Sequence, residues 1–529
     1  MRIGTRSRRT VLRRVWRLPQ RDLCRFYVSH ARSCMPGVYP EHFNWGHILP
    51  RVRISAGRDW FTLFTFTNNL RILATFQHIR STCIITSVSA GRELQLSHIQ
   101  SSVSAVLIQT DRTLLLSGAR IVLALLLIAV QLYVARAMFR VVRSIALTRD
   151  KERRVILAIK VLLCVINIPL LFSLIEGVIH PRELLLYAPP LEYESVVRPF
   201  AYVFFIWTIG SLLFSAVAPI VMACFAVVQF FRRKNTDAED DGPSVEVFDL
   251  SRRRFLQMAL TAVASMPFAV SAYGAVAARA RRVVERVTVP IRNLPAQLDG
   301  LTIVQLSDIH AGMFMRESQM DEYARIANSL KPDIIALTGD FVATTNEQVE
   351  PFARSMSVLE ARHGVFACLG NHDMFTRSED AISRRFAEAG FKLLRNKNEI
   401  IDIDGAKLNV IGVDYFFGTR STSSTLEQVF RGLSLEGTTV LLQHAPQLFP
   451  QAAKFGIDLT LSGHTHGGQI ALTFGDVIIA PARLSTMFLA GLFKIGDSHL
   501  YVNRGLGTTG PPIRINAPPE ITHITLRTA

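Results

Sequence analysis

Five short clusters of polar residues hold side chains that could bind divalent metal ions. Carboxylate, imidazole and amide groups are ligands for hard and borderline metals, and each cluster directly follows an apolar run rich in β-branched residues. Two such ions could share one carboxylate, activate a water and stabilise the oxygens of a hydrolysis, and Asp340 is the natural shared carboxylate. The clusters are Asp308-Ile309-His310, Gly339-Asp340, Gly370-Asn371-His372-Asp373, Gln443-His444 and Gly463-His464-Thr465-His466.

The apolar runs predict the strands that position these clusters. They lie at 301–306, 333–337, 365–369, 439–442 and 459–461. Helical patterns at 320–330 and 349–359 separate the first three runs, as in βαβ units. We therefore expect an α/β fold with the site at the carboxyl ends of the strands. All five loops are expected on one edge of a sheet.

Glycines beside the clusters have a mechanical interpretation. A residue without Cβ tolerates the positive φ and the close backbone approach of a tight turn between a strand and a ligand. The glycines concerned are Gly339, Gly370, Gly463, Gly467 and Gly468.

In order and spacing, these motifs resemble the calcineurin-like metallophosphoesterase superfamily. The motifs are Asp-x-His, Gly-Asp, Gly-Asn-His-Asp, a lone histidine before a small residue, and Gly-His-x-His, within about residues 289–526. The resemblance implies a two-sheet sandwich flanked by helices, two divalent ions, and hydrolysis of a phosphate ester or pyrophosphate by a bridging hydroxide. Gly463–Ile470 and Asn503–Gly507 further resemble a membrane-anchored bacterial branch that is similar to UDP-2,3-diacylglucosamine hydrolases.

The resemblance also implies a role for each residue. Metal ligands would be Asp308, His310 and His466 at the first ion, Asn371, His444 and His464 at the second, and Asp340 between them. His372 would lie near the scissile phosphate, where it can stabilise negative charge or protonate the leaving oxygen. Asp373 is expected to orient His372. The metal pair stays open among Mn, Fe, Zn and Mg. The alternative function is a membrane sensor or scaffold whose metal domain binds a phosphorylated ligand without turnover.

The region before these motifs is apolar enough to cross a membrane. A hydrocarbon core of about 30 Å requires about 20 apolar residues. Four segments meet or approach this length, at 114–134, 155–175, 200–231 and 255–278. They predict an α-helical transmembrane region over 114–278, followed by the metallophosphoesterase domain over 289–529. The fourth segment is rich in alanine, so a cleaved or partly buried helix is its alternative.

Basic residues suggest the topology. The loops 136–154 and 232–254 are rich in arginine and lysine, which predicts that both are cytoplasmic. Ser251–Gln257 resembles a twin-arginine export signal, although a simple positive flank explains it equally well. Both interpretations place the catalytic domain on the outer face of a bacterial inner membrane. We expect a phosphoester substrate, lipid-linked and presented beside membrane lipids, and no nucleic acid.

The first 110 residues differ in composition from the rest of the chain. They contain 16 arginines, no lysine and 4 acidic residues, in a chain of net charge +17. One interpretation is a basic arm that binds nucleic acid or membrane. The favoured one is a disordered or mis-assigned extension upstream of the true start, because the segment shows no domain pattern.

Overall fold

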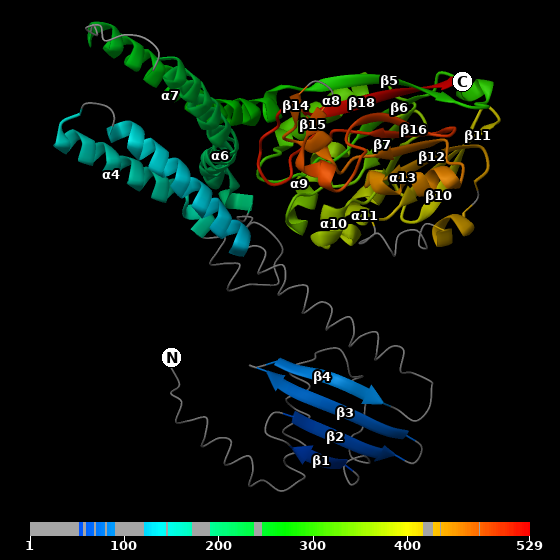
Figure 1. Ribbon diagram of the computed structural model, residues 1–529. Coiled ribbons are helices and arrows are strands. Elements are labelled where there is room, and N and C mark those ends of the chain that lie inside the picture. Colours follow the sequence, from blue (N-terminus) through cyan, green and yellow to red (C-terminus); the bar gives the residue numbers. More distant parts are fainter. Residues whose placement is uncertain are drawn as a thin grey trace. The chain divides into compact units, whose positions relative to one another are not determined.

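The chain forms two compact units, Met1–Ala119 and Arg120–Ala529. The computed structural model describes the strands within residues 52–89 and residues 121–143, 147–171, 191–236, 246–415, 427–433, 435–474 and 477–529. The first unit contains one antiparallel sheet in the order β1-β2-β3-β4 (Figure 1). Its strands are β1 (Val52–Ala56), β2 (Trp60–Thr67), β3 (Leu70–Ile79) and β4 (Thr82–Ser89). The sequence patterns indicated no strands here, and the expectation that the segment is mis-assigned stays a prediction.

Two six-stranded sheets form the core of the second unit. The first has the order β5-β18-β6-β7-β8-β9 and the second the order β10-β11-β12-β13-β17-β16. The first contains β5 (Val283–Ile291), β6 (Thr302–Leu306), β7 (Ile334–Thr338), β8 (Val365–Cys368), β9 (Lys392–Leu393) and β18 (Glu520–Thr528). The second contains β10 (Lys397–Ile403), β11 (Ala406–Val413), β12 (Thr438–Gln443), β13 (Leu459–Ser462), β16 (Gly491–Ile495) and β17 (Ser498–Val502).

The two sheets pack face to face and helices cover their outer faces, as expected. One apolar cluster joins Ile303 and Phe366 of the first sheet to Val410 and Leu442 of the second. A second cluster packs the first sheet against α8 (Glu317–Ser329), α9 (Val349–Met356) and α11 (Glu379–Glu388). A third packs the second sheet against α13 (Phe449–Lys454). Burial of apolar side chains therefore stabilises each sheet on both of its faces.

Each of the five expected ligand strands is present, but they belong to two sheets. β6, β7 and β8 lie parallel in the first sheet, and β12 and β13 lie parallel in the second. The expectation of a single sheet edge was wrong. Parallel strands of both sheets end at the same side of the sandwich, so the loops still converge.

Long helices precede the sandwich. They are a helix at Ile121–Arg143, α4 (Arg149–Ile166), α6 (Glu194–Thr236) and α7 (Glu246–Ala280). Within the described part of the chain, two segments are long and apolar enough to cross a membrane, Ile121–Arg143 and Leu191–Cys224. They overlap the first and third expected spans. The second and fourth spans stay predictions, and residues 114–120 and 172–175 lie outside the described residues.

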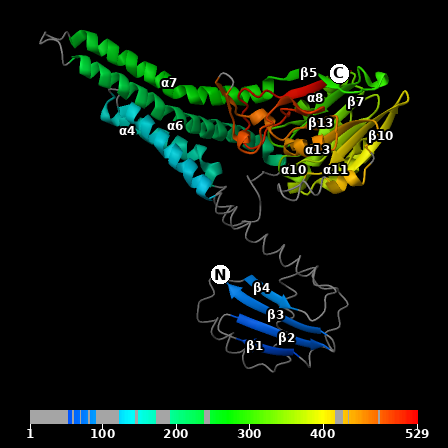
Figure 2. The ribbon, with the colours of Figure 1, turned by 45° about the vertical axis from the view of Figure 1, so that its right-hand side comes forward.

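The helices α6 and α7 pack on each other along an aromatic seam. Trp207 of α6 stacks on Phe268 of α7 with ring centroids 5.3 Å apart, and Phe214 lies 6.5 Å from the same ring. Gly210 leaves room for Phe268, because a Cβ at that position would clash with the ring. Figure 2 shows the two helices running side by side away from the sandwich.

Candidate metal centre

Loops at the carboxyl ends of five strands bring the expected metal ligands together. Three groups of side chains have ligand atoms that all lie within 4.8 Å of one another. The groups are Asp308–His310–His466, His310–Asp340–His372 and Asp340–His444–His464. Because His310 and Asp340 each belong to two groups, the three form one continuous site.

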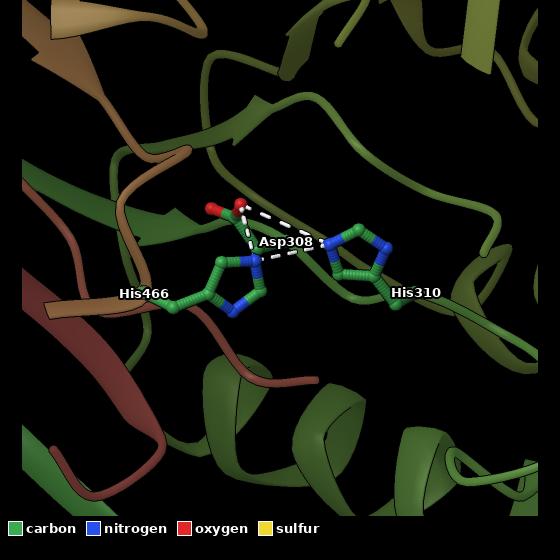
Figure 3. Close-up of side chains that lie close together, drawn as sticks. All are labelled: Asp308, His310 and His466. Atoms are coloured by element: carbon green, nitrogen blue, oxygen red, sulfur yellow. Dashed lines mark hydrogen bonds and ion pairs between the residues drawn. The ribbon is translucent and has the colours of Figure 1, made fainter. Parts of the chain in front are cut away.

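The first cluster consists of Asp308, His310 and His466, as Figure 3 shows. Nε2 of His466 lies 3.2 Å from Oδ1 of Asp308 and 3.2 Å from Nε2 of His310. Two hydrogen bonds fix the position of the Asp308 carboxylate. It accepts one from the Ser307 hydroxyl at 2.6 Å and one from the backbone N–H of His464 at 3.0 Å. The ligand atoms therefore face a common point from two loops, since Asp308 and His310 share the loop after β6 and His466 lies on the loop after β13.

The second cluster shares Asp340 with the first. Oδ2 of Asp340 lies 3.5 Å from Nε2 of His310 and 3.2 Å from Nε2 of His444. Nδ1 of His464 lies 3.2 Å from the same nitrogen of His444. The Nδ1–H of His444 donates to the carbonyl of Thr338 at 2.7 Å, which leaves Nε2 facing Asp340. Asp340 thus stands between the two clusters, as a bridging carboxylate must.

Asn371 begins α10 (Asn371–Phe375) beside Asp340. Its neighbours on either side touch that carboxylate, since the N–H of His372 donates to Oδ1 of Asp340 at 2.8 Å and Gly370 packs directly on it. Oδ1 of Asn371 is buried and accepts no hydrogen bond from any described residue. A buried acceptor without a donor is costly, so this oxygen fits a metal ligand.

The backbone at these ligands is strained. A residue with a side chain at positive φ is uncommon and clusters at functional sites. Five candidate ligands have this conformation: Asp308 (49°), His310 (49°), Asp340 (55°), His464 (71°) and His466 (52°). The glycines beside the clusters have two different roles, positive φ and close backbone approach. Gly339 has a φ of 83°, whereas Gly463 allows close approach, because a Cβ there would meet the side chains of Ser307 and Asp308.

Asp373 organises the ligand loops and does not orient His372. Its carboxylate accepts hydrogen bonds from the N–H groups of Asp340, Phe341 and Gly370 at 2.8 to 2.9 Å. His372 instead donates its Nδ1–H to the carbonyl of Ala343 at 2.6 Å. The expectation for Asp373 was therefore wrong. The carboxylate of Asp373, at the start of α10, accepts its hydrogen bonds from backbone N–H groups. These bonds connect the loop of Asp340 to the loop of Asn371.

Burial keeps the histidines of the first cluster neutral. It lowers the pKa of His310 to about 3 and that of His466 well below its usual range, and nearby positive groups add to both effects. Burial also raises the pKa of Asp308 to about 6. Neutral imidazoles have a free lone pair at neutral pH, which is the form that binds a metal ion.

The second cluster is charged differently. Burial alone would lower the pKa of His444, but the adjacent Asp340 raises it to about 10. Burial would raise the pKa of Asp340, but His444 and His372 hold it well below its usual range. His464 behaves like the first cluster, because burial lowers its pKa to about 4. Without an ion, His444 and Asp340 therefore form a buried ion pair.

Two residues at the site were not anticipated. Arg514 is 1% exposed and donates to the carbonyls of Arg504, Gly505, Gly507 and Ala517. Its Nη2 also lies 3.3 Å from Nδ1 of His466. Thr509 places its hydroxyl 2.9 Å from Nε2 of His466. The Asn503–Gly507 motif pointed to this loop, and an arginine inside the apolar sequence Pro512-Ile513-Arg514-Ile515 was the remaining signal.

Comparisons with known proteins agree with this geometry. The model of the family described as calcineurin-like phosphoesterase matches residues 301–468. The uncharacterized metallophosphoesterase YkuE of Bacillus subtilis is 32% identical over 288 residues, which cover 53% of this chain and 98% of that protein. This chain belongs to the calcineurin-like metallophosphoesterase family. It is a phosphoesterase hydrolase, and its candidate metal-binding residues fit the divalent ions that this family uses.

Other metallophosphoesterases are similar over about the same share of the chain. An uncharacterized metallophosphoesterase of Aquifex aeolicus is 32% identical over 249 residues, covering 46% of this chain and 91% of that protein. A protein of Danio rerio named transmembrane protein with metallophosphoesterase domain is 30% identical over 298 residues, covering 53% of this chain and 63% of that protein. The shared region is therefore about half of the chain.

Proposed function

We propose that this metallophosphoesterase is membrane-anchored and hydrolyses a phosphate ester or pyrophosphate bond of a lipid-linked substrate, such as UDP-2,3-diacylglucosamine. The observation that carries the proposal is the contact between the site loops and α6 and α7. Phe314, four residues after His310, packs edge-on against Tyr202 of α6 with ring centroids 5.3 Å apart. Arg198 of α6 donates to the carbonyl of Met313.

The C-terminal site loop packs on both helices. Ile513 and Ile515 form an apolar cluster with Ala275 of α7 and with residues of α6 that include Ile206 and Ile209. The N–H of Arg514 donates to the carbonyl of Gly274 at 3.0 Å, and Gly274 leaves room for Ile513. The loops that surround the candidate metal centre thus touch α6, which contains most of the apolar segment Leu191–Cys224.

These contacts involve only one end of the α6–α7 pair, so the end far from the site loops can lie in the bilayer. Beyond Leu213, the last α6 residue in that cluster, the sequence has no charge up to Arg232. Its 18 residues span about 27 Å as a helix, close to a hydrocarbon core. Basic residues at 232–234 and 252–254 follow at the far end, which favours a cytoplasmic position for that end and the outer face for the catalytic domain. The transmembrane relative of Danio rerio supports an anchor.

In this proposal the clusters would hold two divalent ions. Asp308, His310 and His466 would hold the first, Asn371, His444 and His464 would hold the second, and Asp340 would contribute to both. Bound there, the ions would lower the pKa of a water and neutralise the charge of phosphoryl oxygens. His372 acts on the substrate, because its Nδ1–H is bound by Ala343, which leaves Nε2 as the ring atom that would meet a phosphoryl or leaving oxygen.

The full chain in detergent-lipid micelles tests this proposal. Loaded with Mn, it is assayed on aryl phosphomonoesters, phosphodiesters, UDP-2,3-diacylglucosamine and a UDP-sugar without acyl chains. We expect turnover that depends on metal and favours the acylated substrate. Equal turnover of lipid and soluble substrates at matched concentration would contradict the lipid-linked class. Metal binding without turnover of any substrate would favour the sensor or scaffold.

A further inference from the structure

Thr509 lies on the loop between β17 and β18, at the mouth of the first cluster. Its hydroxyl oxygen is 3.1 Å from Nε2 of His310 and 2.9 Å from Nε2 of His466. These two nitrogens are 3.2 Å apart. The three atoms form a nearly equilateral triangle. No motif pointed to Thr509, because its partner histidines lie 199 and 43 residues away in the sequence.

The distances match an octahedral coordination shell. With bonds of about 2.1 Å, adjacent ligands of an octahedral ion lie about 3.0 Å apart and opposite ligands about 4.2 Å apart. Thr509, His310 and His466 have the spacing of mutually adjacent ligands. Oδ1 of Asp308 is 3.2 Å from Nε2 of His466 and 4.0 Å from Nε2 of His310, so it has the spacing of a ligand opposite His310.

We propose that the hydroxyl oxygen of Thr509 is a further ligand of the first metal ion. This inference rests on the proposed two-metal site and deepens it. A neutral hydroxyl is a hard oxygen donor, which suits Mn or Mg in octahedral geometry better than tetrahedral Zn. Thr509 therefore biases the first site toward hard, six-coordinate ions.

The loop is built to hold this hydroxyl in place. Oε1 of Gln469 accepts a hydrogen bond from the N–H of Thr509 at 2.9 Å, and Nε2 of Gln469 donates to the carbonyls of Thr509 at 3.1 Å and Pro511 at 2.9 Å. Gln469 follows His466 by three residues and has a φ of 51°. The segment that supplies two histidine ligands thus also clamps the backbone of Thr509, as a preorganised ligand requires.

Metal titration of the full chain tests the assignment. Protein stripped with chelator is titrated with Mn, and bound Mn is counted by electron paramagnetic resonance and calorimetry for wild type, Thr509→Val, Thr509→Ser and Thr508→Val. Valine has nearly the shape of threonine but no ligand oxygen. We expect Thr509→Val to weaken one of two Mn sites by about 10- to 100-fold. Serine should restore the affinity, and the neighbouring Thr508→Val should match wild type. Thr509→Val should also raise the affinity for Zn relative to Mn.

Each outcome decides between explanations. Wild-type Mn affinity in Thr509→Val overturns the proposal, and so does normal Mn binding with impaired turnover, which would assign the hydroxyl to the substrate. If Thr509→Val fails to fold by circular dichroism, Thr509→Ala carries the same test without added methyl groups. Failure of the proposed function is a separate result, since wild type would then bind fewer than two Mn ions or Asp340→Ala would bind both normally.

Discussion

The two halves of the candidate metal centre contain similar ligands but differ in charge. In the first cluster, burial holds both His310 and His466 neutral, and the buried guanidinium of Arg514 lies behind His466. In the second, His444 pairs with Asp340 at 3.2 Å and has its pKa raised to about 10. Both histidines of the first half are therefore neutral at neutral pH, whereas in the second half His464 is neutral and His444 carries a proton.

The surroundings explain this difference. His444 donates through Nδ1 to a backbone carbonyl and faces Asp340 with Nε2, so both ring nitrogens favour protonation. His310 is instead flanked by His372, with ring centroids 4.6 Å apart, and by His466. His466 also has a carboxylate oxygen 3.2 Å from its Nε2, that of Asp308, so the contrast with His444 lies at Nδ1, where His444 meets a carbonyl and His466 meets the Arg514 guanidinium. Four experiments test this contrast.

Removal of the shared carboxylate should have the largest effect. Asp340→Ala takes away the one ligand that touches both clusters, so both metal sites should weaken. We expect kcat/KM to fall by about 1,000-fold or more, measured with metal content by atomic absorption. Asp497→Ala, at an exposed position, is the control. If one site of Asp340→Ala kept its wild-type affinity, the two halves would not share this ligand.

His372→Ala should separate catalysis from metal binding. Its ring centroid lies 4.6 Å from that of His310 in the first cluster, but Ala343 holds its Nδ1–H and the proposed function places it at the substrate. We expect kcat to fall by about 100- to 10,000-fold while two ions remain bound. The measurement is kcat alongside a metal titration. Loss of one bound ion would instead make His372 a metal ligand of the first cluster. Its ligand atom lies within 4.8 Å of those of His310 and Asp340, which allows this arrangement.

Arg514→Met should affect the first half alone. The guanidinium satisfies several buried carbonyls of the 504–517 loop, and methionine cannot donate to them. We expect the free energy of unfolding to fall by about 3 kcal/mol, seen as a lower Tm, together with weaker metal binding at one site. Arg514→Lys should recover part of this, because lysine keeps the charge but not the planar fork. Arg362→Met, at an exposed site, should leave the Tm unchanged, and equal losses at both metal sites would contradict the assignment to the first half.

The strands and the ligand loops could be predicted because their signals are local. Val365–Cys368 is an unbroken apolar run, and the Asn371 and His372 that follow it are readable by type and spacing alone. The sequence could not predict that these strands belong to two sheets, because parallel strands that follow helices have the same apolar pattern in either sheet. Thr509 and Arg514 were missed for a related reason. Their partners are distant in sequence, and a threonine before Gly510-Pro511-Pro512 looks like an ordinary turn residue.

Proton release on metal loading should show the smallest effect and test the contrast most directly. At pH 7, His444 with a pKa of about 10 carries a proton that must leave when the lone pair binds an ion. His310 and His464, with pKa values of about 3 and 4, have none to give. A metal-bound water that ionises releases a proton with or without His444, so the His444 proton is the difference between the two proteins. We expect wild type to release about one proton more per chain than His444→Gln at pH 7, measured by calorimetry in buffers of different ionisation enthalpy, and this difference to decline as pH rises through about 10. The same proton also affects stability. Because the pKa of His444 is raised in the folded chain, its protonation stabilises the metal-free fold at pH values below the pKa of an unfolded histidine. This contribution to the free energy of unfolding is lost as pH rises through about 10. Unchanged proton release in His444→Gln would mean that the two halves do not differ in charge.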